Sequence, residues 1–346
     1  MIRVLRPEEV SPEENSQIYK HAGYTASPAW ARLIEEQYRY PTKFILEGSG
    51  DGMIAMAALT FVNHPIFGRY AITAPYSSYG GAWFGQNSTP TPAFMQQVAD
   101  LSREHACAYT NFRFLSQNPA AMPPTGLIQQ PIYFTYKVPL NTDHELMLAR
   151  YSSNHRNHVR KSLKKGFEIV FGTKELLKDA YEGLAASMRE LGSPYHATSY
   201  LSGILHHLEG QVQLAIVKFG KQIIGAGVFI AQGDTIINLH ANVLRQYRAD
   251  YVGEFFYWSL IEEFTRQGFT TFDLGRSLLG SGNEVFKMKW APERLPLQYW
   301  FMLGKDEKLP ELNQKNPKFA LAIETWKRLP PFVVRAAGPF LINGLA

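Results

Sequence analysis

Hydrophobic and polar positions over the second half of the chain follow the pattern of consecutive strands. Strand-like runs cover residues 211–219, 222–232 and 234–243, and the tight turns Gly220-Lys221 and Gly233-Asp234 join them. Turns this short connect antiparallel neighbours. We therefore predict an antiparallel meander in this part of the chain.

Helical spacing replaces this pattern on both sides of the meander. Near 250–267, Phe255, Trp258 and Phe264 fall on one helical face, and Gly268 ends the pattern. The other elements predicted for this half are a strand at 167–172, helices near 174–191 and 197–208, and strands at 270–274 and 297–303. The last strand is expected to close the same unit.

The first 150 residues predict a similar order of elements. These are strands near 43–48, 53–62 and 69–74, a helix at 93–106, and strands at 109–115 and 132–138. A loop at 75–92, rich in Pro, Gly, Ser and Thr, interrupts them. Two halves of similar wiring indicate two mixed α/β units and an internal duplication.

A cluster of cations separates the two halves. The segment 146–167 contains no acidic residue, and its cations are Arg150, Arg156, Arg160, Lys161, Lys164 and Lys165. Val159 and Leu163 form a narrow apolar stripe and Gly166 ends the pattern, which predicts a short basic helix. We therefore expect an N-terminal domain at 1–149, a C-terminal domain at 150–306, and a tail at 307–346. The tail includes a helix-like segment at 317–328 and is expected to fold back onto the N-terminal domain.

Composition narrows the class of protein. Of the 346 residues, 45% are hydrophobic and 19% are charged, which is typical of a folded globular chain. The single cysteine, Cys107, excludes an internal disulfide. The N-terminal segment lacks the apolar stretch of a signal peptide, so the expected location is cytoplasmic.

Several motifs together resemble one family. They are the basic segment Asn154–Gly166, then Phe272-Asp273-Leu274-Gly275-Arg276-Ser277, Gly280-Ser281-Gly282, Phe286-Lys287-Met288-Lys289-Trp290 and Pro296-Leu297-Gln298-Tyr299. In this combination and order they resemble the FemAB/FemX transferases of the GNAT superfamily. They are most similar to the FemAB-like proteins found beside exosortase/PEP-CTERM and exopolysaccharide genes. The resemblance covers about 145–303 in detail and the first half in outline.

This resemblance implies tandem GNAT-like domains of mixed α/β class with a C-terminal helical tail. It also implies transfer of an activated acyl or aminoacyl group to an amine on a cell-envelope or exopolysaccharide precursor. The donor would be a co-substrate, either aminoacyl-tRNA, acyl-carrier protein or acyl-CoA, and no tightly bound cofactor or metal is expected. The long helical arm that some members insert is missing, which weakens the case for tRNA. A second reading is an acyl-CoA- or carrier-protein-dependent N-acyltransferase, and a third is a non-catalytic module that binds nucleic acid or lipid pyrophosphate.

Lys287 is the predicted catalytic residue. Attack of an amine on an ester or thioester builds negative charge on the carbonyl oxygen, and a fixed cation stabilises that charge. The resemblance places a lysine directly after a phenylalanine at this point, matching Phe286-Lys287. Lys289 is the rival, because the two lysines share a face in an extended segment and diverge in a helix.

Two further groups of residues are candidates for the same site. Asp273, Arg276 and Ser277 follow a strand and surround Gly275, so they are expected at a turn where they orient substrate or form a structural ion pair. Strict alternation would place Asn238, His240 and Asn242 on one face of a strand. This face either lines a substrate groove, with His240 as a proton acceptor, or is a hydrated outer face of the sheet. Tyr257 and Trp290 are candidate pocket walls or core residues.

The basic helix is the candidate site for a polyanionic donor. Arg156, Arg160, Lys161 and Lys164 would bind its phosphates, or they form a solvated helix face. The junction Arg245–Asp250 lacks the glycines of the Gln/Arg-x-x-Gly-x-Gly/Ala loop by which GNAT enzymes bind acetyl-CoA, which argues against that donor. The acid-free tail beyond residue 328 predicts either contact with a membrane surface or packing on the body of the protein.

Overall fold

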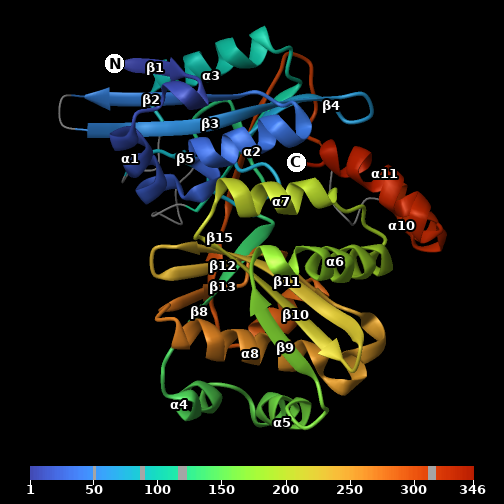
Figure 1. Cartoon of the computed structure of the whole chain (residues 1–346). Coiled ribbons are helices and arrows are strands. Elements are labelled where there is room, and N and C mark those ends of the chain that lie inside the picture. The colour runs from blue at the N-terminus through green and yellow to red at the C-terminus, as the bar shows by residue number, and fades with distance from the viewer. Residues whose placement is uncertain (50–51, 86–89, 116–122, 311–316) are drawn as a thin grey trace. The chain divides into compact units, whose positions relative to one another are not determined.

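The structure is a computed structural model that describes residues 1–49, 52–85, 90–115, 123–310 and 317–346. It divides into two compact units (Figure 1). The first unit comprises Met1–Phe134, Leu295–Glu311 and Asn343–Ala346, and the second comprises Thr135–Arg294 and Leu312–Ile342. Each unit has its own mixed β-sheet, which confirms the predicted fold class.

The first unit is built on a sheet of strand order β1-β2-β3-β4-β6-β16-β7, with β5 paired to β3. Its strands are β1 Ile2–Leu5, β2 Thr42–Ser49, β3 Gly52–His64, β4 Gly68–Ile72, β5 Ala82–Trp83, β6 Tyr109–Phe114, β7 Leu127–Gln129 and β16 Gln298–Leu303. Its α-helices are α1 Pro12–Ala22, α2 Pro28–Tyr38 and α3 Pro92–Glu104, and 3-10 helices cover Pro7–Glu9 and Tyr24–Ala26.

The second unit has the strand order β14-β8-β13-β12-β11-β10-β9, with β15 paired to β8. Its strands are β8 Tyr133–Pro139, β9 Glu168–Gly172, β10 Val212–Phe219, β11 Gln222–Gln232, β12 Thr235–Val243, β13 Thr271–Asp273, β14 Ser277–Leu278 and β15 Glu293–Pro296. Its α-helices are α4 His144–Ala149, α5 Ser153–Ser162, α6 Leu177–Leu191, α7 Thr198–His207, α8 Val252–Arg266, α9 Gly282–Met288, α10 Pro317–Arg328 and α11 Pro331–Asn343. Short 3-10 helices cover Lys174–Leu176 and Arg245–Asp250.

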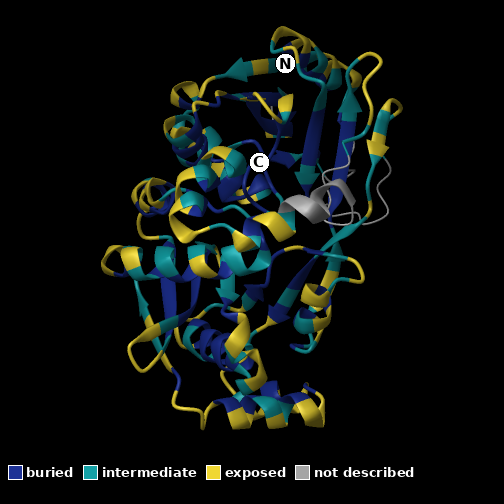
Figure 2. Cartoon of the chain, turned by 90° about the vertical axis from the view of Figure 1, so that its right-hand side faces the viewer, coloured by how far each residue is buried: buried dark blue, intermediate teal, exposed yellow. Residues whose placement is uncertain are grey.

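The predicted meander is confirmed. Strands β9, β10, β11 and β12 pair antiparallel in sequence, whereas β12 and β13 are parallel. Helices α6 and α8 cover opposite faces, because Gly183 of α6 lies against Ala226 while Phe229 contacts the α8 rings of Phe256 and Phe264. Figure 2 shows the central strands of this sheet as buried, with the exposed residues on the outer helices and loops.

A β-bulge interrupts β12. Val228 of β11 pairs with His240 and the next residue, Phe229, pairs with Asn238, so Leu239 is the extra residue. An inserted residue reverses the alternation of side chains beyond it. The bulge therefore places Asn238 on the α8 face and His240 on the α6 face.

Each sheet contains a strand from the other half of the chain. The segment 297–303, predicted to close the second unit, instead pairs as β16 with β6 of the first unit, so that prediction is wrong. The segment 132–138 likewise pairs as β8 with β13 in the second sheet. The contiguous boundaries 1–149 and 150–306 consequently differ from the compact units.

Most of the C-terminal tail belongs to the second unit, which corrects the prediction that it packs on the N-terminal domain. In α10, the indole Nε1 of Trp326 donates to the Ser193 carbonyl at 3.1 Å. Of the described tail residues, 307–310 and the last four lie in the first unit, where the Tyr70 hydroxyl donates to the Gly344 carbonyl at 2.9 Å.

Candidate functional site

Lys287 is fixed inside the second unit. It lies on α9, which begins after Ser281, whose hydroxyl accepts from the Glu284 amide. Its ammonium donates to the carbonyls of Gly275 and Arg276, at 2.8 Å each, and lies 5.5 Å from the centre of the Tyr136 ring. The residue is only 8% exposed, so the ammonium faces the interior and not the solvent.

Asp273 supplies the negative charge at this site. It is the last residue of β13 and is fully buried. Its Oδ1 accepts from the Thr135 hydroxyl at 2.6 Å and from the Gly275 amide at 2.8 Å. Gly275 has a φ of 72°, a left-handed conformation that favours glycine, so the turn needs this residue. The carboxylate thus fixes the turn whose carbonyls hold Lys287.

Burial shifts the titration of Lys287. Desolvation lowers the pKa of its ammonium to about 7, with the Asp273 carboxylate opposing the shift and the Arg276 guanidinium adding to it. Arg276 itself is exposed, while Ser277 is buried. At neutral pH the lysine therefore exists in both charged and neutral forms, which is the range in which enzymes use lysines in proton transfer.

This shift predicts a pH-dependent difference in stability between Lys287→Met and the unsubstituted chain. The unfolded lysine keeps its proton to about pH 10, whereas the folded lysine loses it near pH 7, where its pKa lies. Between these values the unfolded state binds more protons, so folding stability rises with pH. The unsubstituted chain should gain about 1.4 kcal/mol per pH unit relative to the variant. Denaturant unfolding from pH 7 to 9 measures this difference. If the free energy of unfolding changed equally with pH in both proteins, the lowered pKa of the buried Lys287 ammonium would be contradicted.

Lys289 points to a different partner. Because α9 is helical, two residues of separation turn the side chain away from Lys287, and its ammonium pairs with Glu254 of α8 at 3.1 Å. The structure therefore brings Lys287, and not Lys289, to Asp273. The Gly280–Gly282 segment forms the start of α9, and the Gly280 amide donates to Glu284. It thus acts as a helix cap in this structure.

The β12 residues do not share one face as predicted. Asn238 donates to the Tyr257 hydroxyl at 3.1 Å on the α8 side. His240 pairs with Val228 and Asn242 with Ala226, so both lie on the α6 side. The prediction of a common polar face is wrong because the bulge at Leu239 reverses the alternation.

His240 lies in a buried aromatic cluster. Its ring centre is 5.6 Å from that of Tyr195 and 5.6 Å from that of His196. Desolvation lowers the pKa of its imidazole to about 4, so it is neutral at pH 7. Its Nε2 and the Tyr195 hydroxyl have no hydrogen-bond partner among the described residues. A half-buried neutral imidazole whose Nε2 is enclosed and available can accept a proton only transiently.

Tyr257 and Trp290 belong to the core and not to an open wall. Trp290 is completely buried, and its ring stacks on Tyr257 with centres 5.8 Å apart. Tyr151 and His155, which no sequence motif indicates, complete this cluster, with ring centres 5.5 and 4.6 Å from that of Trp290. Within the described residues, the Tyr151 hydroxyl, both ring nitrogens of His155 and the Trp290 Nε1 lack hydrogen-bond partners. Only their proximity in the fold reveals this cluster.

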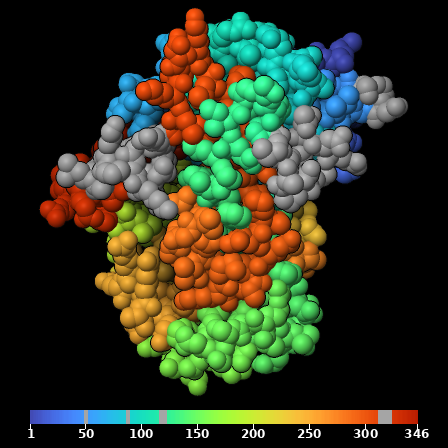
Figure 3. Space-filling model, turned by 180° about the vertical axis from the view of Figure 1, so that it is seen from behind, coloured from blue at the N-terminus to red at the C-terminus, as the bar shows by residue number. Residues whose placement is uncertain are grey.

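The basic helix α5 presents part of its charge to solvent. Arg160 and Lys161 of α5 are exposed, as is Lys164 in the turn after it, whereas Arg156 donates to the Tyr151 carbonyl at 2.8 Å and so also has a structural role. Figure 3 shows the green α4–α5 segment directly beside the orange residues that follow β13. Arg150 links the two, because it donates to the Ala291 carbonyl at 3.0 Å.

Helix α5 also borders the N-terminus of α8. Lys165 pairs with Asp250 at 2.6 Å, and the His158 ring stacks on Tyr251 with centres 4.3 Å apart. Tyr251 precedes α8 with a φ of 62°, a left-handed conformation that favours glycine. The first backbone bond of α8 joins the Phe255 amide to the Tyr251 carbonyl, so the three preceding amides point out of the helix end.

The position of this helix start changes which residues align with the acetyl-CoA-binding loop of GNAT enzymes. Because α8 begins at Val252, the loop that enters it is Arg248-Ala249-Asp250-Tyr251-Val252-Gly253. Read in this frame, it has the arginine and the final glycine of the GNAT pattern, and Tyr251 adopts the glycine-like conformation at the remaining position. The frame Arg245–Asp250 lies three residues too early because that segment is a 3-10 helix.

Comparisons with known proteins agree with this geometry. Residues 151–288 match the family described as the acetyltransferase (GNAT) domain. No curated protein shows significant similarity to the sequence. FemX is 13% identical in structure-based comparison, with a TM-score of 0.65 over 88% of this chain and 97% of FemX.

Two further solved structures have the same fold. L-PGS from Bacillus licheniformis is 14% identical, with a TM-score of 0.55 over 87% of this chain and 94% of its own. A tandem GNAT protein from the clavulanic acid biosynthesis pathway is 11% identical, with a TM-score of 0.54 over 87% of this chain and 98% of its own.

By the family match, residues 151–288 form an acetyltransferase (GNAT) domain. Over most of its length the chain has the double fold of FemX and of the tandem GNAT protein, in agreement with the FemAB/FemX-like resemblance of its motifs.

Proposed function

We propose that the protein forms an amide bond between an activated acyl or aminoacyl donor and an amine on a cell-envelope or exopolysaccharide precursor. The observation that carries this proposal is the buried ammonium of Lys287, held at the turn that follows β13. We place the reaction in the C-terminal domain proposed at 150–306, with the protein acting in the cytoplasm at the inner face of the membrane.

The strand geometry supports a donor site next to Lys287. The parallel pairing of β12 and β13 ends at Ile237 and Asp273, while β12 continues to Val243. Among the described residues, β12 beyond Ile237 pairs with β11 alone. The proposal places the donor carbonyl beside this edge of β12.

The chemistry then needs little more than positioning and charge stabilisation. The amine nitrogen attacks the donor carbonyl carbon, and the bond to the leaving thiol or ribose oxygen breaks. Lys287 stabilises the developing oxyanion, and Asp273 keeps it charged and oriented. The amine proton passes to the leaving group, with His240 as the candidate intermediate acceptor. In this proposal Arg276 and Ser277 contact the acceptor, together with Asn242.

The basic helix supports binding of a polyanionic donor. Exposed Arg160 and Lys161 lie on α5 with His158, and Lys164 and Lys165 lie in the turn directly after this helix. His158 and Lys165 contact the loop that enters α8. A helix N-terminus attracts phosphate through its outward amides and dipole. The proposal therefore places the donor phosphates between α5 and the start of α8.

Salt dependence identifies the donor. If the donor is aminoacyl-tRNA and about six phosphates are bound, affinity for bulk tRNA should fall on the order of 10³-fold between 50 and 200 mM salt. Arg160→Glu with Lys164→Glu should weaken binding about tenfold or more at low salt. Fluorescence anisotropy with labelled tRNA measures both effects.

A matched control changes net charge equally elsewhere. Lys221→Glu with Lys305→Glu replaces two exposed lysines outside α5 and should bind tRNA like the unsubstituted chain. Equal loss in both double variants would show that overall charge, and not α5, attracts the nucleic acid. Weak salt dependence together with tight acetyl-CoA binding would favour the smaller donor.

The second candidate function is acyl-CoA- or carrier-protein-dependent N-acylation. The observation that favours it is the loop Arg248–Gly253, in which Tyr251 takes a left-handed conformation at the start of α8. A turnover assay tests both functions. Its donors are acetyl-CoA and bulk tRNA charged with radiolabelled amino acids, and its acceptors are a glucosamine oligosaccharide and a peptidoglycan precursor with a free lysine amine. Absence of an amide product with every pair would favour the non-catalytic binding module.

A further inference from the structure

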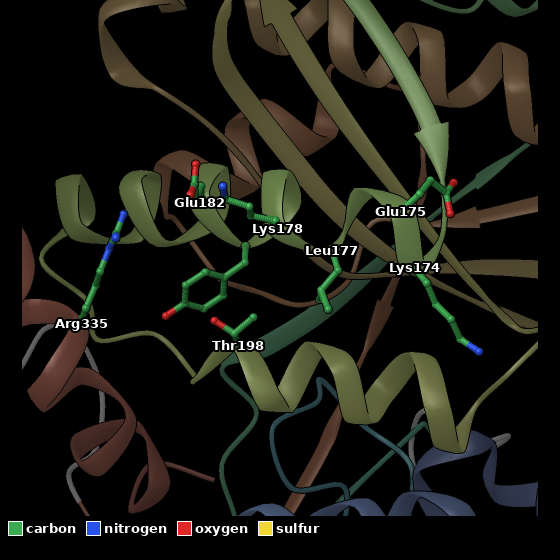
Figure 4. A pocket seen from close by; sticks show the side chains of 8 residues that line it. Lys174, Glu175, Leu177, Lys178, Glu182, Thr198 and Arg335 are labelled. Atoms are coloured by element: carbon green, nitrogen blue, oxygen red, sulfur yellow. The ribbon is translucent and has the colours of Figure 1, made fainter.

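A hollow lies on the second unit away from Lys287. Its volume is about 400 Å³, and its lining includes Lys178, Glu182, Thr198 and Arg335. Figure 4 shows Arg335 extending from α11 toward α6, which carries Lys178 and Glu182. Lys287 is not among its lining residues, so the proposed reaction does not account for it.

Helix α11 is anchored to the second unit, which fixes the direction of its faces. Arg189 of α6 donates to the Leu329 carbonyl at 2.9 Å, just before α11 begins. Val334 and Gly338 are buried, and a Cβ at Gly338 would lie 3.1 Å from the Tyr195 carbonyl oxygen. Such a close approach holds the helix against the connection between α6 and α7.

The opposite face of α11 is apolar and exposed. Phe332 is 73% exposed and Phe340 is 48% exposed. With Ala336, which is also exposed, they recur every four residues and so form one stripe along the helix. Exposing a phenylalanine instead of burying it costs about 1.5–3 kcal/mol, so a fixed stripe of this kind indicates a surface that becomes covered.

Positive charge surrounds this stripe. Residues 325–346 contain Lys327, Arg328 and Arg335 and no acidic residue. Lys327 pairs with Glu324, whereas Arg328, Arg335 and the nearby Lys178 form no ion pair with any described residue. Two acids, Glu175 and Glu182, also line the hollow. The excess of positive charge therefore comes from the segment 325–346 itself, which contains three cations and no acidic residue.

We propose that α11 docks the protein on the surface of a bilayer that contains anionic lipid. Phe332 and Phe340 enter the headgroup region, while Arg328, Arg335 and Lys178 contact lipid phosphates. Exposed aromatic residues flanked by cations are the combination that binds such surfaces. None of the described helices is both long and apolar enough to cross a membrane, so the docking is peripheral. A protein docked in this way can reach an acceptor attached to a lipid.

Vesicle sedimentation with the full chain tests the docking surface. The protein should bind vesicles of phosphatidylcholine with phosphatidylglycerol more tightly than vesicles of phosphatidylcholine alone. Phe332→Ser with Phe340→Ser should lower binding about tenfold or more, because apolar area no longer leaves water. Arg328→Glu with Arg335→Glu should remove the preference for phosphatidylglycerol. These measurements need no donor or acceptor, so they are independent of the proposed reaction.

A matched control uses Ile66→Ser, which removes another exposed apolar side chain, 61% exposed in the first unit. This variant should bind vesicles like the unsubstituted chain. All variants should have the same midpoint of thermal unfolding as the unsubstituted chain. Equal loss in the control, or no binding of the unsubstituted chain to either vesicle, would overturn the proposal. It would also be overturned if the phenylalanine variant converted a dimer to a monomer without changing vesicle binding, because a second copy would then cover the stripe.

Discussion

Lys287→Met is expected to lower kcat for amide formation about 10²–10³-fold on the donor and acceptor pair that the unsubstituted chain uses. The reason is that the ammonium, bound to the Gly275 and Arg276 carbonyls, is the buried cation beside the proposed donor site. Methionine has a similar length and fills the same space without charge. Single-turnover measurement of the amide product by mass spectrometry separates this loss from a change in substrate binding.

Lys289→Met is the matched control for this experiment. It removes the same functional group two residues away, on the side of α9 that faces Glu254. Its kcat should remain within a few-fold of that of the unsubstituted chain. If Lys289→Met caused the larger loss, or if Lys287→Met kept full activity, the assignment of the oxyanion donor would be wrong.

Asp273→Asn is expected to move the pH dependence of the reaction toward acid. The carboxylate raises the pKa of Lys287 and opposes the shift to about 7 caused by burial. Without this charge the lysine pKa should fall by about one to three further units. The ammonium is lost as pH rises through its pKa, so at pH 7.5 the variant should lose at least about tenfold in kcat and should recover as pH decreases.

A control preserves the carboxylate and removes one of its hydrogen-bond donors. Thr135→Val deletes the hydroxyl that donates to Asp273 at 2.6 Å and should lower stability by about 1–3 kcal/mol while leaving the pH optimum nearly unchanged. A kcat profile from pH 5.5 to 8.5 measures both variants. Uniform loss of activity in Asp273→Asn at every pH would indicate that the carboxylate acts by fixing the turn and not through the charge of Lys287.

The local pattern of the sequence was sufficient for most elements of the second unit. The meander and the helices that became α6, α7 and α8 follow from alternation, periodicity and glycine turns. Strand partners did not follow, because the pattern of 297–303 shows that it is a strand but not which sheet receives it. The bulge at Leu239 was also hidden, since an inserted residue leaves the same alternation of residue types in the sequence.

The candidate site was predicted in part. The motif resemblance selected Lys287 and Asp273, which the structure places at one turn, but the sequence left the choice between the two lysines open. The choice depended on α9, a short helix whose cap at Ser281 was not recognised. The cluster of Tyr151, His155 and Trp290 could not be predicted, because its members come together only through tertiary packing.

The position of β16 also affects how the chain can be synthesised. Among the strands that the structure describes, β7 pairs with β16 alone, and Trp300 of β16 packs among Phe84 and Phe114 in the core. A nascent chain emerging from the ribosome therefore cannot complete its N-terminal core until residue 303 is available, long after the first 134 residues have been translated. Co-translational folding of this unit must wait for nearly the whole polypeptide, and an N-terminal fragment should depend on chaperones.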